Sequence, residues 1–208
     1  MQEYKTMFHE AVGELTEKKS RFIAHIRHIE SPDDATAFLN DIRSKYYDAR
    51  HHVYAYILKD GTKKYSDDGE PQGTSGLPSL NVLEGYGLVD SMVIITRYFG
   101  GTLLGTGGLV RAYSGAVKNA VENGEIVTMC KCACVRISCD YSQWDRVKKF
   151  TEDFGATVDF VEFSSRVDAE ISFRTELLDN YKNQFVELTD GKGISAVTGE
   201  KFTGVKNL

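Results

Sequence analysis

The chain has 208 residues, of which 41% are hydrophobic and 26% are charged, and its formal net charge is −5. This composition is typical of a globular protein with one large or two small hydrophobic cores. The negative charge argues against a dedicated duplex-DNA-binding protein, which is usually basic. The N-terminal residues lack the pattern of a signal peptide, and no apolar run approaches the ~20 residues of a membrane helix. We therefore expect a cytoplasmic protein with no membrane contact.

The N-terminal part of the chain alternates strand and helix signals. Ser31 followed by Pro32 and two acids indicates the start of a helix, because a hydroxyl can cap the first turn and acids suit its positive end. The VIIT segment before Arg97 is typical of a buried central strand. The patterns predict strands at 21–26, 52–58 and 88–96, and helices at 31–46, 74–86 and 109–120.

The pattern changes after Glu125. The following segment predicts strands at 126–140, 157–163, 167–173 and 195–202, and helices at 141–154 and 177–188. The resulting β-α-β-β-α-β order is that of a ferredoxin-like domain. We therefore expect an α+β protein with two domains, 1–126 and 127–208, and a boundary near Gly124–Thr128.

A glycine-rich loop lies between the strand ending near Arg97 and the next helix. Glycine loses more backbone entropy on folding than any other residue, so this loop has to turn tightly or lie close to something else. Its backbone N–H groups and the positive helix end could receive an anion. Thr106 nevertheless replaces the lysine of a P-loop, and no G-x-G-x-x-G occurs, so we expect no nucleotide cofactor. The glycines are Gly100, Gly101, Gly105, Gly107 and Gly108.

Three acids, Asp67, Asp68 and Glu70, lie in a polar loop. Such acids can bind a hard cation, but three rarely complete its ligand set and the order of a calcium-binding loop is absent. We expect an acidic turn that caps the next helix or pairs with a base, and no metal. His51 and His52 precede or open a strand, where neighbours point to opposite faces and cannot both bind one metal. One of them is a candidate general base, or one is hydrogen-bonded at the sheet end and the other exposed.

Arg97 and Arg111 flank the glycine-rich loop. They are either phosphate contacts or internal partners of the acidic loop. Tyr98 and Phe99 could stack on a base or on a protein side chain.

The cysteines fall between Cys130 and Cys139. Cys130, Cys132 and Cys134 share one face of the predicted strand, at steps of ~6.6 Å, which is too wide for sulfurs around one zinc ion. We therefore expect a buried cysteine-lined face and a reducing compartment.

Four motifs together carry a resemblance to a known family. They are KSRFI at Lys19–Ile23, DARHH at Asp48–His52, SDDGEPQGTSGLP at Ser66–Pro78 and RYFGGTLLGTGGLVRAY at Arg97–Tyr113. In this order they resemble the IMPACT (UPF0029) family, in its bacterial YigZ-like branch. The resemblance covers the N-terminal domain, and the C-terminal domain is similar by pattern and position. It implies a ribosomal-protein-like N-terminal domain similar to domain IV of elongation factor G, and a ferredoxin-like domain similar to its domain V. It also implies a link to translational control, in which eukaryotic relatives act.

We interpret the chain as a non-enzymatic cytosolic regulator associated with translation, whose partner is the ribosome, RNA or a ribosome-bound protein. The expected contact surface consists of Arg97, Tyr98, Arg111 and the five loop glycines, together with His51, His52, Asp67, Asp68 and Glu70. One alternative is a small-molecule hydrolase that uses His51 or His52 with the three acids, although no nucleophile stands out. A second alternative is a nucleic-acid-binding module off the ribosome, against which the negative net charge argues. We expect no catalytic residue and no cofactor.

Overall fold

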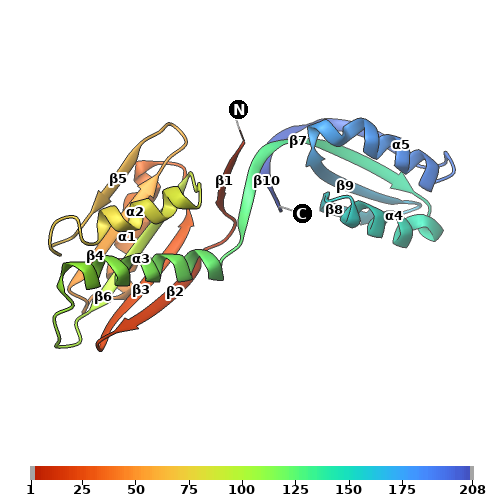
Figure 1. The fold of residues 1–208 in the computed structure, drawn as a ribbon. Helices are drawn as coiled ribbons and strands as arrows, with labels where there is room; N and C mark the ends of the chain where they lie inside the picture. Colours follow the sequence, from red (N-terminus) through yellow and green to blue (C-terminus); the bar gives the residue numbers. More distant parts are fainter. Residues whose placement is uncertain (1–2, 207–208) are drawn as a thin grey trace. The chain divides into compact units, whose positions relative to one another are not determined.

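The computed structural model describes residues 3–206, which form two compact units. The first unit spans Tyr4–Val127, and the second runs from Thr128 onward and includes Glu3. Each unit contains both strands and helices, so the protein is a two-domain α+β protein (Figure 1). Within the described part of the chain, no helix is both long and apolar enough to cross a membrane.

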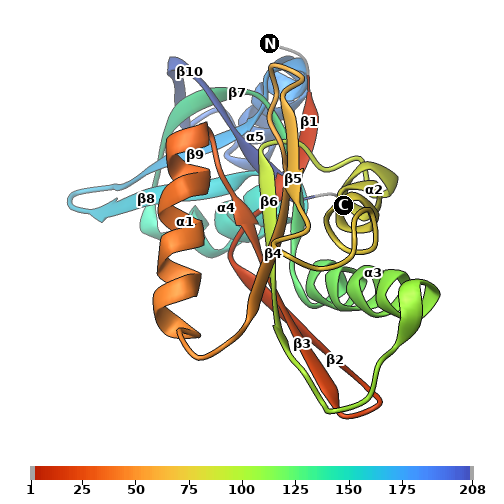
Figure 2. The ribbon, with the colours of Figure 1, turned by 90° about the vertical axis from the view of Figure 1, so that its left-hand side faces the viewer.

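The N-terminal unit is built on an antiparallel sheet with helices on both faces. The strands follow the order β2-β3-β6-β4-β5. Helix α1 covers one face, and helices α2 and α3 cover the other (Figure 2). The elements are β1 (Tyr4–Met7), β2 (Ala11–Glu17), β3 (Ser20–His28), α1 (Pro32–Lys45), β4 (His51–Ile57), β5 (Lys63–Ser66), α2 (Gly76–Gly85), β6 (Ser91–Tyr98) and α3 (Gly105–Asn123).

Strand β6 lies at the centre of this sheet and contributes to both cores. Met92 and Ile94 pack in the cluster that includes residues of α1, whereas Val93 and Ile95 pack in the cluster that includes residues of α3. Because successive side chains of a strand point to opposite faces, a strand covered on both sides has to be apolar throughout. The central strand expected from the VIIT segment is thus confirmed.

The predicted helix start at Ser31 is also present in the structure. The Ser31 hydroxyl accepts a hydrogen bond from the backbone N–H of Asp34, at 3.1 Å, and Pro32 opens α1. Strands β1, β2 and β5 were not predicted. Strand β2 contains Gly13 because helix α3 lies directly against it: a Cβ there would be 2.1 Å from the backbone nitrogen of Ala120. Strand β5 is a short, largely exposed edge strand.

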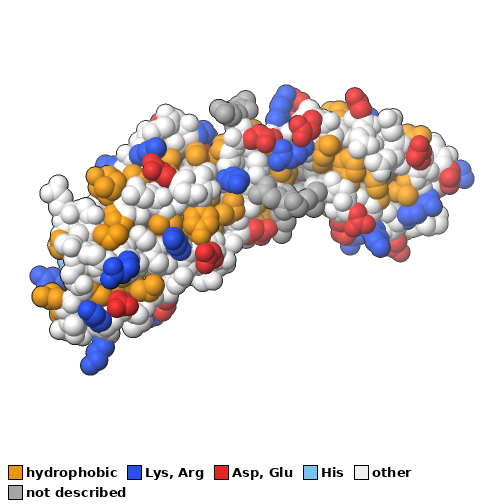
Figure 3. All heavy atoms as spheres, viewed as in Figure 1, with side chains coloured by type: hydrophobic (Ala, Val, Ile, Leu, Met, Phe, Trp, Pro, Cys, Tyr) orange, Lys and Arg blue, Asp and Glu red, His pale blue; other side chains and the backbone are white. Residues whose placement is uncertain are grey.

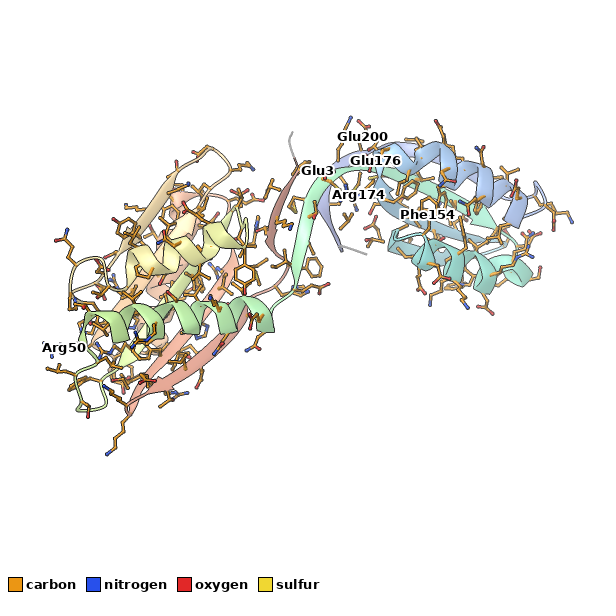
Figure 4. All side chains as sticks on the ribbon, viewed as in Figure 1. Glu3, Arg50, Phe154, Arg174, Glu176 and Glu200 are labelled. Carbon is orange, nitrogen blue, oxygen red and sulfur yellow. The ribbon has the colours of Figure 1, made fainter. Side chains whose placement is uncertain are left out.

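The C-terminal unit has the β-α-β-β-α-β order expected of a ferredoxin-like domain. Its strands lie in the order β10-β7-β9-β8, and helices α4 and α5 pack with the sheet core through an aromatic group that includes Phe154, Phe173 and Tyr181. Figure 4 shows Arg174 with Glu3 and Glu176, which pair with its guanidinium at 2.6 and 3.9 Å. The elements are β7 (Ile126–Cys139), α4 (Tyr141–Asp153), β8 (Thr157–Phe163), β9 (Val167–Arg174), η1 (Thr175–Leu177), α5 (Leu178–Leu188) and β10 (Ile194–Lys206).

The cysteines of β7 are free thiols. Cys130 and Cys132 are buried with their Sγ atoms 3.7 Å apart, and Cys134, on the same strand face, is half-buried. Burial, followed by the neighbouring Cys130, raises the pKa of the Cys132 thiol to about 12. Such a thiol is protonated and inert at neutral pH. Among residues 3–206, no group of three His, Cys, Asp or Glu side chains is placed to hold a metal ion.

Each unit has its own buried core, which leads to a prediction about the C-terminal part. Residues 128–208 expressed alone are expected to fold, because the aromatic core and both helices lie within this segment. Circular dichroism should show helix and strand signals and a cooperative thermal transition. A fragment that stays unfolded while the full chain is folded would contradict the independence of the two domains.

Candidate functional site

The predicted site residues gather at one end of the N-terminal sheet, which we call the tip. It consists of the β2–β3 turn (17–20), the segment before β4 (46–51), the acidic loop (67–73) and the loop between β6 and α3 (99–104). The strand register brings these segments together, because Arg21 lies opposite Tyr98 and His51 lies opposite Arg97. Figure 2 shows the β2–β3 turn beside the loop that leads into α3.

Asp67 caps helix α2. Its Oδ1 accepts hydrogen bonds from the Ser75 hydroxyl at 2.7 Å and from the Gly76 backbone N–H at 2.8 Å. Its Oδ2 accepts one from the backbone N–H of Gly73, also at 2.8 Å. Burial alone would raise the pKa of Asp67, but these hydrogen bonds favour the carboxylate and lower the pKa below its ordinary value. The helix-capping role expected for the acidic loop thus falls to Asp67.

Asp68 ties the acidic loop to the start of β4. Its Oδ2 accepts a hydrogen bond from the backbone N–H of His52 at 2.6 Å, and its other oxygen lies 3.3 Å from Arg43. The His51 ring donates from Nδ1 to the carbonyl oxygen of Asp68 at 2.7 Å. His51 is therefore hydrogen-bonded at the sheet end.

His52 differs from expectation, because it is buried rather than exposed. Burial lowers the pKa of its imidazole, and its Nε2 has no hydrogen-bond partner among the described residues. The ring is therefore neutral at physiological pH. It belongs to the interior of the unit and offers no side chain to a macromolecular partner.

Glu70 of the acidic loop and Arg97 at the end of β6 form a buried ion pair at the base of the tip. Glu70 Oε1 accepts hydrogen bonds from Arg97 at 2.5 Å and from the Tyr113 hydroxyl at 2.8 Å. The two charged side chains are only 3% and 7% exposed. Burial and then the Glu70 carboxylate raise the pKa of Tyr113, which stays protonated. The expectation that Arg97 and Glu70 lie on a contact surface is therefore corrected, because each is paired inside the unit.

The glycine-rich loop packs directly on the β2–β3 turn. A Cβ at Gly100 would lie 2.1 Å from the carbonyl carbon of Lys19, so only glycine fits there. The backbone N–H of Gly100 donates to the Ser20 hydroxyl at 3.1 Å. Gly101 and Gly105 have φ values of +84° and +71°, in the left-handed region that favours glycine. The loop thus joins two turns of the tip.

Helix α3 begins at Gly105 without a side-chain cap. Gly107 is exposed, whereas Gly108 is buried against Leu104. In contrast to the start of α2, no carboxylate among the described residues occupies this positive helix end. An uncapped first turn of a long helix favours an anion.

Exposed aromatic and aliphatic side chains stand on the tip. Tyr47, Leu103 and Phe99 are 85%, 83% and 54% exposed, respectively. Tyr98 is less available, because its hydroxyl donates to Asp48 at 2.7 Å, a bond that raises its pKa to about 12. Sequence reasoning missed Tyr47 and Leu103, although a tyrosine pair in an otherwise polar segment before a strand could have indicated the first.

Four cations surround these apolar groups and make no ion pair among residues 3–206. They are Lys18, Lys19, Arg50 and Arg111, and all four are exposed. Figure 4 shows Arg50 at the same end of the unit as the start of α3. Of the two arginines that flank the glycine-rich loop, only Arg111 is therefore available to a partner. The other cations were not predicted as site residues.

The hydrolase alternative gains no support from this arrangement. Asp67, Asp68 and Glu70 each accept hydrogen bonds from the protein itself, and the third is buried. A general base needs a lone pair that faces the substrate. The three acids therefore stabilise the loop and its neighbours, and none of them is placed to act as a general base.

The buried ion pair leads to a prediction about stability. Replacing Arg97 with alanine leaves the Glu70 carboxylate buried and unpaired, which should cost about 3–5 kcal/mol of the free energy of unfolding. Arg111→Ala is the matched control and should stay within about 0.5 kcal/mol of the wild type. Urea unfolding of both variants makes the comparison. Equal losses for the two variants would show that the pair does not hold the unit together.

The cap on α2 leads to a prediction about pH. Asp67→Asn should cost about 1 kcal/mol at neutral pH, because the amide replaces one accepting oxygen. The folded-state pKa of Asp67 lies below its ordinary value of 3.8, so its contribution is present above that value and lost as the pH falls through the folded-state pKa. The stability difference from the wild type should therefore stay constant from pH 7 to about pH 5 and shrink as the pH falls below about 4, so that it is smaller at pH 3 than at pH 7. Asp41→Asn, on the exposed side of α1, should show no such difference at either pH.

Comparison with known proteins agrees with this architecture. The family model described as the Impact N-terminal domain matches residues 18–121, and a domain of unknown function, DUF1949, matches residues 137–192. An IMPACT family member of Haemophilus influenzae is 33% identical over 92% of this chain and 95% of its own length. YigZ of Escherichia coli is 41% identical over 61% of this chain and 64% of its own. A solved structure described as that of a hypothetical protein has a TM-score of 0.61 and 27% identity, and the match covers 95% of this chain and 98% of that one. The chain belongs to the IMPACT family.

Proposed function

We propose that this protein is a cytoplasmic regulator of translation that contacts ribosomal RNA through the tip of its N-terminal domain. Membership of the IMPACT family supports the link to translation, because the family resemblance points to translational control. The observation that carries the RNA contact is the set of four exposed cations, with no ion pair in the described part of the chain, near exposed apolar side chains.

The charges on the tip suit a phosphate backbone. The whole chain has a net charge of −5, but Lys18, Lys19, Arg50 and Arg111 make no ion pair among residues 3–206. Lys18 and Lys19 project from a tight turn, in which both residues have positive φ values. Arg50 comes from the segment before β4, and Arg111 lies in the second turn of α3, close to the uncapped start of that helix. Lysine, arginine and helix N-termini are the groups that contact phosphate oxygens.

The exposed rings suit unpaired bases. Phe99 and Tyr47 present aromatic surface to solvent on the same end of the unit as the cations. Single-stranded or looped RNA is recognised by stacking of splayed bases on such rings. Duplex DNA would not offer its bases in this way. The combination therefore favours structured RNA with exposed loops, which ribosomal RNA provides.

The test is co-sedimentation with ribosomal particles from the cell that makes this protein, at several salt concentrations. A variant with Lys18, Lys19, Arg50 and Arg111 all changed to alanine should bind more weakly. Each lost phosphate contact should lower the slope of log affinity against log salt by about 0.7–0.9. The melting temperature should change little, because these side chains are exposed.

The matched control changes Lys148, Lys149, Lys182 and Lys192 of the C-terminal unit to alanine, which removes the same formal charge. This control should bind as the wild type does. Equal weakening of both variants would mean that only total charge matters and would remove the tip from the proposal. A wild-type protein that never sediments with the particles would end the proposal of ribosome contact.

A further inference from the structure

A groove of about 500 Å³ lies between helices α2 and α3, and it includes none of the segments that form the tip. The α3 positions that line it recur every fourth residue, so they stand along one side of that helix. The groove is therefore a trough between two helices. It is lined by Pro78, Asn81, Val82, Gly85, Tyr86, Val110, Ser114 and Lys118.

The two walls of the groove differ in chemistry. The α2 wall carries no charge: Pro78, Val82 and Gly85 are apolar, and Asn81 is neutral. The α3 wall consists of Val110, Ser114 and one cation. Lys118 lines it directly, and Arg111 stands seven residues earlier on the same side of the helix, which places the two about 10 Å apart along the axis.

Neither of these cations makes an ion pair among residues 3–206. The acid near them is Glu122, whose carboxylate accepts a hydrogen bond from the Tyr86 hydroxyl at 3.0 Å. Figure 3, in which α2 and α3 face the viewer, shows hydrophobic side chains along this face with lysine and arginine side chains beside them. The groove thus pairs an apolar floor with one positively charged edge.

We propose that this groove binds an amphipathic helix of a partner protein, with its apolar side chains between α2 and α3 and acidic side chains along α3. A helix in a groove is a common mode of protein recognition, and it uses anchors at i, i+3, i+4 and i+7. The spacing of Arg111 and Lys118 matches two acids seven residues apart on the partner. Opposite charges along one edge also fix the direction and register of the bound helix.

An RNA strand fits this surface less well than such a helix does. The apolar floor would gain nothing from a phosphate backbone, and Tyr86 is the only aromatic side chain among the residues that line the groove. A second copy of this chain is the other alternative occupant of the groove. The experiment distinguishes the helix from the RNA strand and from the second copy.

The experiment uses the full chain and two fluorescent peptides of about 20 residues, long enough to form a helix alone. One peptide has leucines on one face and glutamates at positions seven apart, and the other has lysines in place of the glutamates. Fluorescence anisotropy measures the affinity of each peptide for the wild type, Lys118→Glu, Asn81→Trp and Lys148→Glu. Asn81→Trp fills the groove, and Lys148→Glu makes the same charge change on the other unit.

We expect the glutamate peptide to bind the wild type more tightly than the lysine peptide does. Lys118→Glu should weaken the glutamate peptide about tenfold, a change of 1.4 kcal/mol, and should improve binding of the lysine peptide. Asn81→Trp should weaken both peptides, and Lys148→Glu should change neither. All three altered side chains are exposed, so the variants should remain folded.

Several results would overturn the proposal. They are no binding of the glutamate peptide at about 1 mM, equal binding of the two peptides, or equal effects of Lys118→Glu and Lys148→Glu. Binding of a single-stranded RNA oligonucleotide that Asn81→Trp abolishes would assign the groove to RNA. Self-association in analytical ultracentrifugation that Asn81→Trp abolishes would assign it to a second copy of the chain.

Discussion

The buried ion pair between Glu70 and Arg97 is the interaction on which the tip depends. It joins the acidic loop to the end of the central strand β6, and the Tyr113 hydroxyl brings helix α3 to the same carboxylate. Two charges removed from water are costly unless each is paired and hydrogen-bonded. The Glu70–Arg97 pair is buried at the point where the irregular loops of the tip meet the sheet, and it holds those loops in place.

Other contacts extend this base toward the surface. Ser20 lies within 3.5 Å of Arg97 and accepts the Gly100 N–H, so the β2–β3 turn and the glycine-rich loop meet above the ion pair. Asp67 and Asp68 fix the acidic loop to α2 and to β4. The loops therefore have little freedom at their roots, while Tyr47, Phe99 and Leu103 remain exposed at their outer ends. A rigid frame that carries exposed cations and rings loses less entropy when it binds a partner.

Much of the fold follows from the sequence, because its strongest signals are local. The cap at Ser31, the apolar VIIT strand and the β-α-β-β-α-β order each depend on neighbouring residues. Strand β2 was missed because its glycine serves a contact with Ala120, more than a hundred residues away, and the sequence pattern alone does not show this contact.

The candidate site was predicted as a region but not residue by residue. The glycines and acids marked the right segments, since their turns and caps are local. Whether Arg97 faces a partner or Glu70 depends on which way the end of β6 turns into the core, and sequence spacing is equally compatible with both. Lys18, Lys19 and Arg50 stand out only once the sheet register brings their turns together. The groove between α2 and α3 also depends on how two distant segments pack.

Hydrogen–deuterium exchange on the full chain, with and without ribosomal particles, tests the central claim most directly. Binding is expected to slow exchange at the tip, in residues 17–20, 46–51 and 99–104, because these backbone segments would be covered. Exchange in α4 and β8 of the C-terminal unit should stay unchanged. Slowed exchange confined to the C-terminal unit, with none at the tip, would contradict the account.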